Sequence, residues 1–572
     1  MRRAYVFLAF LLAAFPLFAG TARELHIVTT GDVHGAFFDE PYAGGSIRPS
    51  LMSVKCYVDS LRSAAGEDNV ILLDAGDCLQ GDNVVYYYNY VATDVPHIFP
   101  RIASYIGYDV CVLGNHDIET GHPCYDRVCS EMSSCGIPYL AGNAITPAGE
   151  SYFPEYAVLD KNGVKVLVLG YDNANIAGWL SRELWEGMEF KSLKPLVQER
   201  VNALNARLRP DATIVVVHSG TGSGDGTQLE NQGLDIFEDL VGVDLLVCAH
   251  DHTPYTSSKP GCAMVNGGAR AGHVGHAVIS LEKKSGRYYK TGIEAGIVRL
   301  DASHVDKVMK EHFRDEYMAV RDFTLREVGA LENPLSTRDA YRGMSDYINL
   351  IHTVQLSASG AAVSFAAPLT FDGEVAAGKL VFNDMFTIYP YENQLFVMTL
   401  KGSEIVSALE FSYDRWIQPP GEHVLRISNR EDQRNGTERW SFDTRPYNFD
   451  SAAGIVYTVD VTKPFGSRVE VSSMADGTAF RMDEWYNVAV TSYRANGGGD
   501  ILTKGAGIPH GMLEERIVAR YPEIRELIYR FISSRPVVTS SSVGDRTLIG
   551  GWKFVPEFLT GPLMDKDMGL LF

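Results

Sequence analysis

Five short apolar runs in the first half of the chain each end in residues that bind metal ions. Runs of this kind, rich in β-branched residues and bounded by turns, predict buried strands. In open α/β sheets, sites form where the carboxyl ends of strands open into loops, so the five ends are expected to build one site. Its oxygen and imidazole ligands would suit two divalent cations. The residues that follow the runs are Asp32 and His34, Asp77, Asn115, His218, and His250 with His252.

Two of the acidic residues in this pattern are expected to differ in role. Asp77 follows its strand through Gly76, which lets the backbone turn tightly, and it is the natural carboxylate to bridge two cations. Asp74, which directly follows the apolar run, is expected to support the site from behind the ligands.

Size and charge limit the possible functions. A chain of 572 residues with 45% hydrophobic content can form two or three domains with real cores. The net charge of −20 gives no electrostatic footprint for duplex nucleic acid. A small anionic substrate would instead need local positive charge, which metal ions can supply. No oligomeric state is assigned.

The N-terminus reads as a targeting segment. Met1–Arg3 is basic, Ala4–Phe18 is apolar, and small residues follow up to Ala22, so residues 1–22 are predicted to be a signal peptide. Export to a periplasm or to the outside follows, and no later segment is long and apolar enough to span a bilayer. An oxidising compartment permits disulfides, and the best candidates are Cys124, Cys129 and Cys135.

The chain divides into recognisable parts. Residues 23–300 alternate strands with helical segments, as in a layered α/β sandwich, and residues 301–323 are predicted to form a linker helix. Residues 324–533 are predicted to form a smaller α/β domain. Within it we expect a helix over Met344–Gln355 and strands over Leu395–Leu400 and Ile455–Val461. Residues 534–572 are left without an assignment.

The ordered ligand pattern closely resembles that of the calcineurin-like metallophosphoesterases, and the second part narrows the likeness to the two-domain 5′-nucleotidase superfamily. The resemblance implies a four-layer α/β/β/α sandwich joined by a helix to a smaller α/β nucleotide-binding domain. It also implies two divalent metal ions, such as Zn²⁺ or Mn²⁺. One would be held by Asp32, His34, Asp77 and His252, and the other by Asp77, Asn115, His218 and His250. His116 would stabilise the transition state with Glu119, which stands where the family often has Asp.

Two segments of the second domain place an aromatic residue beside polar or glycine-rich backbone. Stacking a nucleobase on an aromatic ring contributes about 1–3 kcal/mol with little dependence on the base, and a glycine run lets backbone approach a sugar closely. The resemblance implies a base held between Tyr391 and Tyr493. The predicted substrate-binding residues are Tyr391, Asn393, Tyr493, Arg494, Asn496, Gly497 and Gly498.

Departures from the family pattern indicate the branch. The 5′-nucleotidase branch usually carries a phosphate-binding Arg before the first stacking residue, but residues 363–369 contain none. The tyrosines and nearby motifs, among them Tyr447–Asp450, look more like 2′,3′-cyclic-nucleotide 2′-phosphodiesterase/3′-nucleotidases. The alternatives are a 5′-nucleotidase acting on nucleoside 5′-monophosphates or UDP-sugars, and hydrolysis of other phosphoesters or thiosulfate esters. A secreted nucleotide-binding protein without catalysis is the alternative of another class.

Overall fold

The computed structural model describes residues 22–431 and 438–572. The predicted signal peptide spans residues 1–22. Residues 1–21 lie outside the described residues, and Ala22 is the first residue of strand β1. Within the described ranges, none of the helices combines the length and apolar character needed to cross a bilayer.

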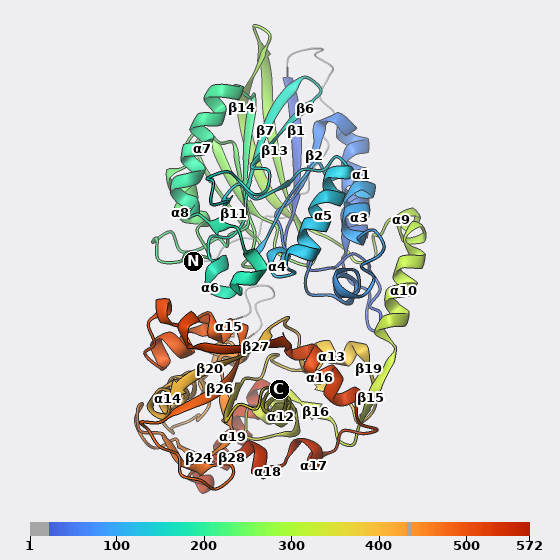
Figure 1. Ribbon diagram of the computed structural model, residues 1–572. Coiled ribbons are helices and arrows are strands. Elements are labelled where there is room, and N and C mark those ends of the chain that lie inside the picture. The colour runs from blue at the N-terminus through green and yellow to red at the C-terminus, as the bar shows by residue number, and fades with distance from the viewer. Residues whose placement is uncertain (1–21, 432–437) are drawn as a thin grey trace.

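The first domain is built on two six-stranded sheets (Figure 1). In the first sheet, β1, β2, β3 and β4 run parallel and the hairpin β13–β14 adds two antiparallel strands. Its order is β14 (Arg287–Arg299), β13 (His273–Lys284), β1 (Ala22–Thr30), β2 (Val70–Asp74), β3 (Val110–Val112) and β4 (Tyr139–Leu140). The second has the order β11 (Tyr255–Lys259), β12 (Cys262–Asn266), β10 (Leu245–Cys248), β9 (Ala212–Val217), β7 (Val164–Tyr171) and β6 (Tyr156–Lys161).

Alternation along the strands explains the layers. In β1, Leu25 and Ile27 pack in the core between the two sheets, whereas Val28 faces the helices outside. Because both faces of the central strands are covered, these strands are buried along their whole length, as in β9. The outer helices are α1 (Leu51–Ala65), α3 (Ile98–Ile106) and α5 (His122–Ser134) on the first sheet, and α7 (Leu193–Leu208) and α8 (Gly233–Asp239) on the second. The predicted four-layer α/β/β/α sandwich is confirmed.

The linker helix predicted over residues 301–323 is not one continuous helix. The structure has two helices, α9 (Lys307–His312) and α10 (Arg314–Thr324), with Phe313 between them in a non-helical conformation. Asp306 caps the first by accepting a hydrogen bond from the Met309 N–H at 2.6 Å. The Phe313 ring is buried against Tyr105 of the first domain, which holds the break in place.

The second domain has a five-stranded sheet and a smaller three-stranded one. The predicted helix and both predicted strands are present, as α12 (Asp346–Ser359), β20 (Gln394–Lys401) and β24 (Ile455–Asp460). The larger sheet has the order β23 (Ser451–Ala453), β17 (Val363–Ala366), β26 (Trp485–Thr491), β20 and β27 (Ile517–Glu523). The smaller has the order β25 (Val469–Met474), β24 and β28 (Gly550–Val555).

Residues 534–572 are part of this second fold. Strand β28 pairs in parallel with β24, and helix α19 (Glu557–Leu571) follows it. Trp552, Phe554 and Met564 belong to the same hydrophobic cluster as β20 and β24. The unassigned tail therefore completes the core of the second domain.

The predicted disulfide is wrong, because all eight cysteines are free thiols. Cys124 and Cys129 lie five positions apart on α5, and at 3.6 residues per turn such side chains point to different sides of a helix. The Cys124 thiol instead donates to Asn89 Oδ1 at 3.3 Å.

Candidate metal centre

All seven predicted metal ligands lie at one edge of the first domain. Asp32 and His34 follow β1, Asp77 follows β2, Asn115 opens the short helix α4 (Asn115–Ile118), His218 follows β9, and His250 and His252 follow β10. Their side chains form two groups, Asp32 with His34 and His252, and Asp77 with His218 and His250, each with candidate ligand atoms within 4.8 Å of one another. Asn115 joins the second group through Oδ1, which lies 2.9 Å from His250 Nδ1.

The two groups are adjacent. His218 Nε2 lies 3.1 Å from Asp77 Oδ2 and 4.0 Å from Asp32 Oδ1, and His34 Nε2 lies 4.0 Å from Asp77 Oδ2. Asp77 thus stands between both groups, where a bridging carboxylate is expected.

The backbone at these ligands is strained. Five of the ligands have φ angles in the left-handed region, which residues other than glycine rarely adopt. The angles are 50° at Asp32, 49° at His34, 62° at Asp77, 79° at His250 and 57° at His252. Each such residue costs about 1–3 kcal/mol and persists only where the surroundings determine it fully. Strain concentrated in this way marks a functional site.

Hydrogen bonds to the protein orient the ring nitrogens. His218 Nδ1 lies 2.7 Å from the Ala75 carbonyl and His34 Nδ1 lies 3.0 Å from the Gln80 carbonyl, so each can donate there and present Nε2 to the site. Burial lowers the pKa of His250 to about 3 and the pKa of His34 well below its ordinary value, whereas the charges of Asp77 and Asp32 outweigh burial and raise the pKa of His218. Neutral imidazoles are the form that binds metal ions.

A single buried carboxylate, Asp117, ties two ligand loops together. Its Oδ1 accepts from the N–H groups of Cys78 and Leu79 at 2.9 and 2.8 Å. Its Oδ2 accepts from those of Asp77 and Gly114 at 3.0 and 2.9 Å. Asp74 supports the neighbouring turn as expected, accepting from Thr30 Oγ1 at 2.5 Å and from the Gly76 N–H at 2.9 Å.

The donor set fits divalent cations. Asp77 Oδ2 and His218 Nε2 are buried 3.1 Å apart and have no other hydrogen-bond partner among the described residues, and a buried polar atom is costly unless something binds it. Asp32 and Asp77 are buried, and burial raises the pKa of Asp32 well above its ordinary value. Carboxylate, amide oxygen and imidazole together suit borderline cations.

The predicted pair His116 and Glu119 is formed. His116 Nδ1 lies 2.5 Å from Glu119 Oε2, and the backbone N–H of His116 donates to Asp77 Oδ1 at 2.8 Å. Burial would lower the pKa of His116, but the negative charges of Asp77 and Glu119 outweigh it and raise that pKa to about 9. The ring is therefore protonated at neutral pH beside the ligand cluster.

The predicted stacking tyrosines come with a third aromatic residue. Tyr391 precedes β20 and Tyr493 lies in α15 (Ser492–Ala495), both half-buried. Tyr447 lies edge-on to Tyr391, with ring centroids 6.3 Å apart at 81°. Burial raises the pKa of Tyr391 to about 12, and Tyr447 and Tyr493 add to the shift, so the three phenols are near neighbours.

Arg494 has no free donor for a substrate, although it is among the predicted substrate-binding residues. The buried guanidinium donates to Asp450 Oδ2 at 2.9 Å, to Asn448 Oδ1 at 3.2 Å, and to the carbonyls of Gly498 and Tyr447. Arg494 therefore joins the loop that carries Tyr447 to the loop that carries Tyr493.

The glycines that follow Tyr493 leave room for its ring. A Cβ atom at Gly498 would lie 2.4 Å from the Tyr493 ring, and Gly497 has a φ of 97°. The closest approach to Gly498 is therefore by the Tyr493 ring, whereas the sequence predicted a substrate sugar there. Asn393 is half-buried, and its carbonyl accepts from the Ile524 N–H at 2.9 Å.

Trp179 is the main residue that sequence reasoning missed. Its ring stacks on His250, with centroids 5.2 Å apart at 24°, and its carbonyl accepts from Asn496 Nδ2 at 3.3 Å. It ends the short helix α6 (Ile176–Trp179), in a segment with no periodic pattern that could have singled it out.

The metal-ligand edge of the first domain faces the second domain. Figure 1 shows α4 and α6 above α15 and β27. Direct contacts join the two sides: Tyr90 donates to Glu392 at 3.1 Å, Ser181 to Gln394 at 3.2 Å, and Arg520 pairs with Glu183 at 3.1 Å. The ligand cluster and the three tyrosines therefore belong to one interdomain region.

The fold is that of a metallophosphoesterase domain followed by a second domain of the 5′-nucleotidase C-terminal type. Residues 25–254 match the family model for the calcineurin-like phosphoesterase, and residues 327–504 match that for the 5′-nucleotidase C-terminal domain. The chain is a two-domain member of this group of phosphoester hydrolases, whose first domain implies divalent metal ions.

Individual relatives are distant. The chain is 21% identical to a trifunctional nucleotide phosphoesterase of Bacillus subtilis over 95% of its own length, but spans only 40% of that protein. It is 22% identical to a 2′,3′-cyclic-nucleotide 2′-phosphodiesterase/3′-nucleotidase of Salmonella typhimurium, over 83% of this chain and 82% of the relative. Among solved structures, a putative 5′-nucleotidase from Staphylococcus aureus superimposes with a TM-score of 0.74 at 19% identity, over 93% of this chain and 99% of that one. That likeness shows the fold.

Proposed function

We propose that the chain is a nucleotide phosphoester hydrolase that acts on 2′,3′-cyclic nucleotides and 3′-nucleotides. The observation that carries the proposal is the placement of the ligand cluster and His116 on one side of the domain interface, with Tyr391, Tyr447 and Tyr493 on the other. A nucleotide would reach both at once, with its phosphate at the cluster and its base at the tyrosines.

Two cations, Zn²⁺ or Mn²⁺, would be held as the resemblance implies. Asp32, His34, Asp77 and His252 would hold one, and Asp77, Asn115, His218 and His250 the other. When bound, such ions act as Lewis acids that activate water, orient the phosphoryl group and offset its charge.

The protein's own groups supply the remaining steps. Glu119 fixes Nδ1 of His116, so the protonated ring can present Nε2 to a phosphoryl or leaving-group oxygen and donate its proton there. Tyr391 and Tyr493 would hold the base, at about 1–3 kcal/mol for each stacked face. Arg494 would keep these aromatic loops in register.

The absence of Arg from residues 363–369 favours the cyclic and 3′ branch over a 5′-nucleotidase. The distinguishing experiment measures phosphate and nucleoside release from 2′,3′-cyclic AMP, 3′-AMP and 5′-AMP, with Mn²⁺ and with chelator. Preference for the first two substrates supports the proposal, and preference for 5′-AMP contradicts the branch while leaving the metal centre intact. Nucleotide binding that survives chelator, without any turnover, would favour the non-catalytic alternative.

Export is proposed from the basic and apolar start of the chain, Met1–Phe18. The substrate would then be met in a periplasm or outside the cell. Sequencing the N-terminus of the mature protein tests the proposal, and retention of Met1 would contradict it.

A further inference from the structure

The loop between β12 and β13 brings an arginine to the metal-ligand cluster. The Arg270 N–H donates to the Asp32 carbonyl at 2.9 Å, and Asn266 fixes the start of the loop by donating to Asp251 at 2.8 Å. Arg270 and Ala271 both have left-handed φ angles, 53° and 52°. Two consecutive residues in this region mark a strained conformation that the surroundings impose.

The Arg270 guanidinium lies beside His34. A Cβ atom built on Gly81 would be 3.0 Å from His34 Cβ and 3.4 Å from Arg270 Nη2, so the guanidinium lies over the bare backbone of Gly81. Burial is the main cause that lowers the pKa of His252, and the positive charge of Arg270 lowers it further. The guanidinium therefore borders the cluster that holds His34 and His252.

No acceptor holds this guanidinium in place. Across residues 22–431 and 438–572, the Arg270 side chain has no hydrogen-bond acceptor, and no carboxylate lies within ion-pair distance of it. Asp82 is the acid whose charge acts on the pKa of Arg270, but it already pairs with Arg48 at 2.6 Å.

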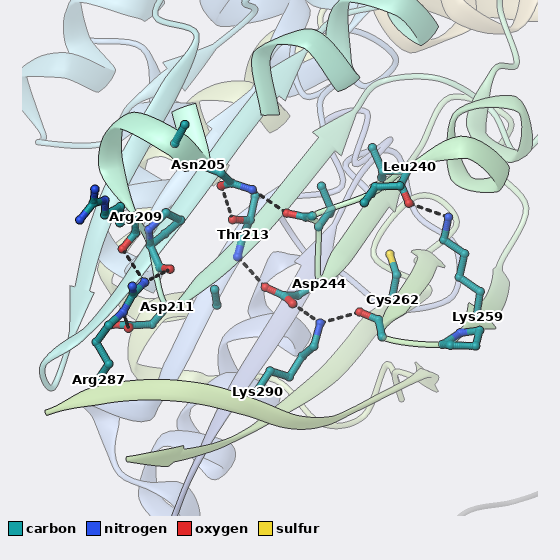
Figure 2. A pocket seen from close by; sticks show the side chains of 18 residues that line it. Asn205, Arg209, Asp211, Thr213, Leu240, Asp244, Lys259, Cys262, Arg287 and Lys290 are labelled. Atoms are coloured by element: carbon teal, nitrogen blue, oxygen red, sulfur yellow. Dashed lines mark hydrogen bonds and ion pairs between the residues drawn. The ribbon is translucent and has the colours of Figure 1, made fainter. Parts of the chain in front are cut away.

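Three other cations on this domain are held by acceptors of the protein. At the opposite edge, the hollow in Figure 2 is lined by Lys259, Lys290 and Arg287. Lys259 donates to the carbonyls of Phe237, Glu238 and Leu240, Lys290 to Asp244 and the Gly261 carbonyl, and Arg287 to two carbonyls. These three cations hold the fold together, whereas the Arg270 fork is exposed with its donors free.

We propose that Arg270 binds the phosphoryl oxygens of the substrate at the metal centre. A planar guanidinium fork matches two phosphate oxygens, and a charge-assisted pair of hydrogen bonds is among the stronger polar contacts. Arg270 would supply, from the first domain, the guanidinium that residues 363–369 of the second domain lack. The inference rests on the proposed function for its substrate class, but binding of inorganic phosphate tests it separately.

The experiment compares Arg270→Met and Arg270→Lys with the full-length parent and with Arg287→Met, a matched arginine at the opposite edge. Calorimetry measures binding of inorganic phosphate to the Mn²⁺-loaded proteins, and kinetics measures KM for p-nitrophenyl phosphate, which has no base. Loss of one charge-assisted hydrogen bond corresponds to about tenfold or more in phosphate Kd. Arg270→Met should show that loss with unchanged metal content, Arg270→Lys a smaller one, and Arg287→Met none.

Either of two results overturns the inference. Phosphate Kd in Arg270→Met within about twofold of the parent would show that the guanidinium does not bind phosphate, since one such hydrogen bond is worth more than that. Loss of bound Mn²⁺ in Arg270→Met would assign Arg270 to the stability of the ligand loops. If the parent binds phosphate but hydrolyses no nucleotide, the proposed function fails while the Kd comparison still decides the role of Arg270.

Discussion

Replacing Asp117 with Asn should destabilise the first domain severely while changing a single atom. The carboxylate is buried and accepts four backbone hydrogen bonds, two on each oxygen. An amide keeps one oxygen and turns its NH₂ group toward two N–H donors, which then lose their acceptor. Each buried donor left unsatisfied costs about 1–3 kcal/mol, so the free energy of unfolding should fall by about 2–6 kcal/mol.

The assay is chemical denaturation of Asp117→Asn, of the parent and of Asp94→Asn. Burial and the charge of Asp77 raise the pKa of Asp117 to about 6, so the buffer must lie well above that pH for the carboxylate to be ionised. Asp94 is exposed, and among the described residues none bonds to its side chain, so its variant carries the same charge change at the surface. A surface substitution is expected to stay within about 0.5 kcal/mol of the parent.

A loss in Asp117→Asn no larger than in Asp94→Asn would refute the reasoning. It would mean that the ligand loops hold their conformation without this carboxylate. The amount of bound Mn²⁺ gives a second reading, because two of the four donors are the backbone N–H groups of Asp77, a predicted ligand, and of Gly114, which precedes the predicted ligand Asn115.

Three further predictions concern the site. Glu119→Gln should lower the pKa of His116, now about 9 because Asp77 and Glu119 outweigh burial; protonated His116 is then lost at lower pH, and the alkaline limb of kcat against pH should move down by about one unit or more. An unmoved limb would show that His116 is not the titrating acid. Chelator should abolish turnover and lower the melting temperature, because buried Asp32 and Asp77 lose their counter-charge; calorimetry with and without Mn²⁺ checks this. Tyr391→Ala should raise KM for 3′-AMP by about 5–150-fold, the loss of one stacked face, and leave KM for p-nitrophenyl phosphate unchanged; equal effects on both substrates would contradict base stacking.

The ligand positions were predictable because each depends on local sequence. A short apolar run ending in Asp or His specifies both a buried strand and the residue at its carboxyl end, as β2 and Asp77 show. Parallel pairing then places such ends along one edge, whatever the detail of the loops. The pairing of His116 with Glu119 could be predicted for the same reason, since a separation of three positions on a short helix brings two side chains together.

Features that depend on distant contacts were not predictable. In the sequence Arg494 resembles a free substrate ligand, but in the fold its guanidinium donates to Asp450 and to the Tyr447 carbonyl on another loop. The break at Phe313 follows from its burial against Tyr105, more than two hundred residues earlier in the chain. The tail has little periodicity of its own, and its strand β28 forms by pairing with β24. In each case the deciding partner lies outside any local window.

The strain at the ligands has a consequence for how the centre is held together. Five left-handed ligand residues cost about 5–15 kcal/mol in all, a penalty that must be met before any cation binds if the loops are to keep this shape. Asp117 and the carbonyls of Ala75 and Gln80 hold these loops through hydrogen bonds within the protein. The strands behind them are buried on both faces. The centre is therefore preorganised by the fold, so chelation should remove activity and some stability without unfolding the loops.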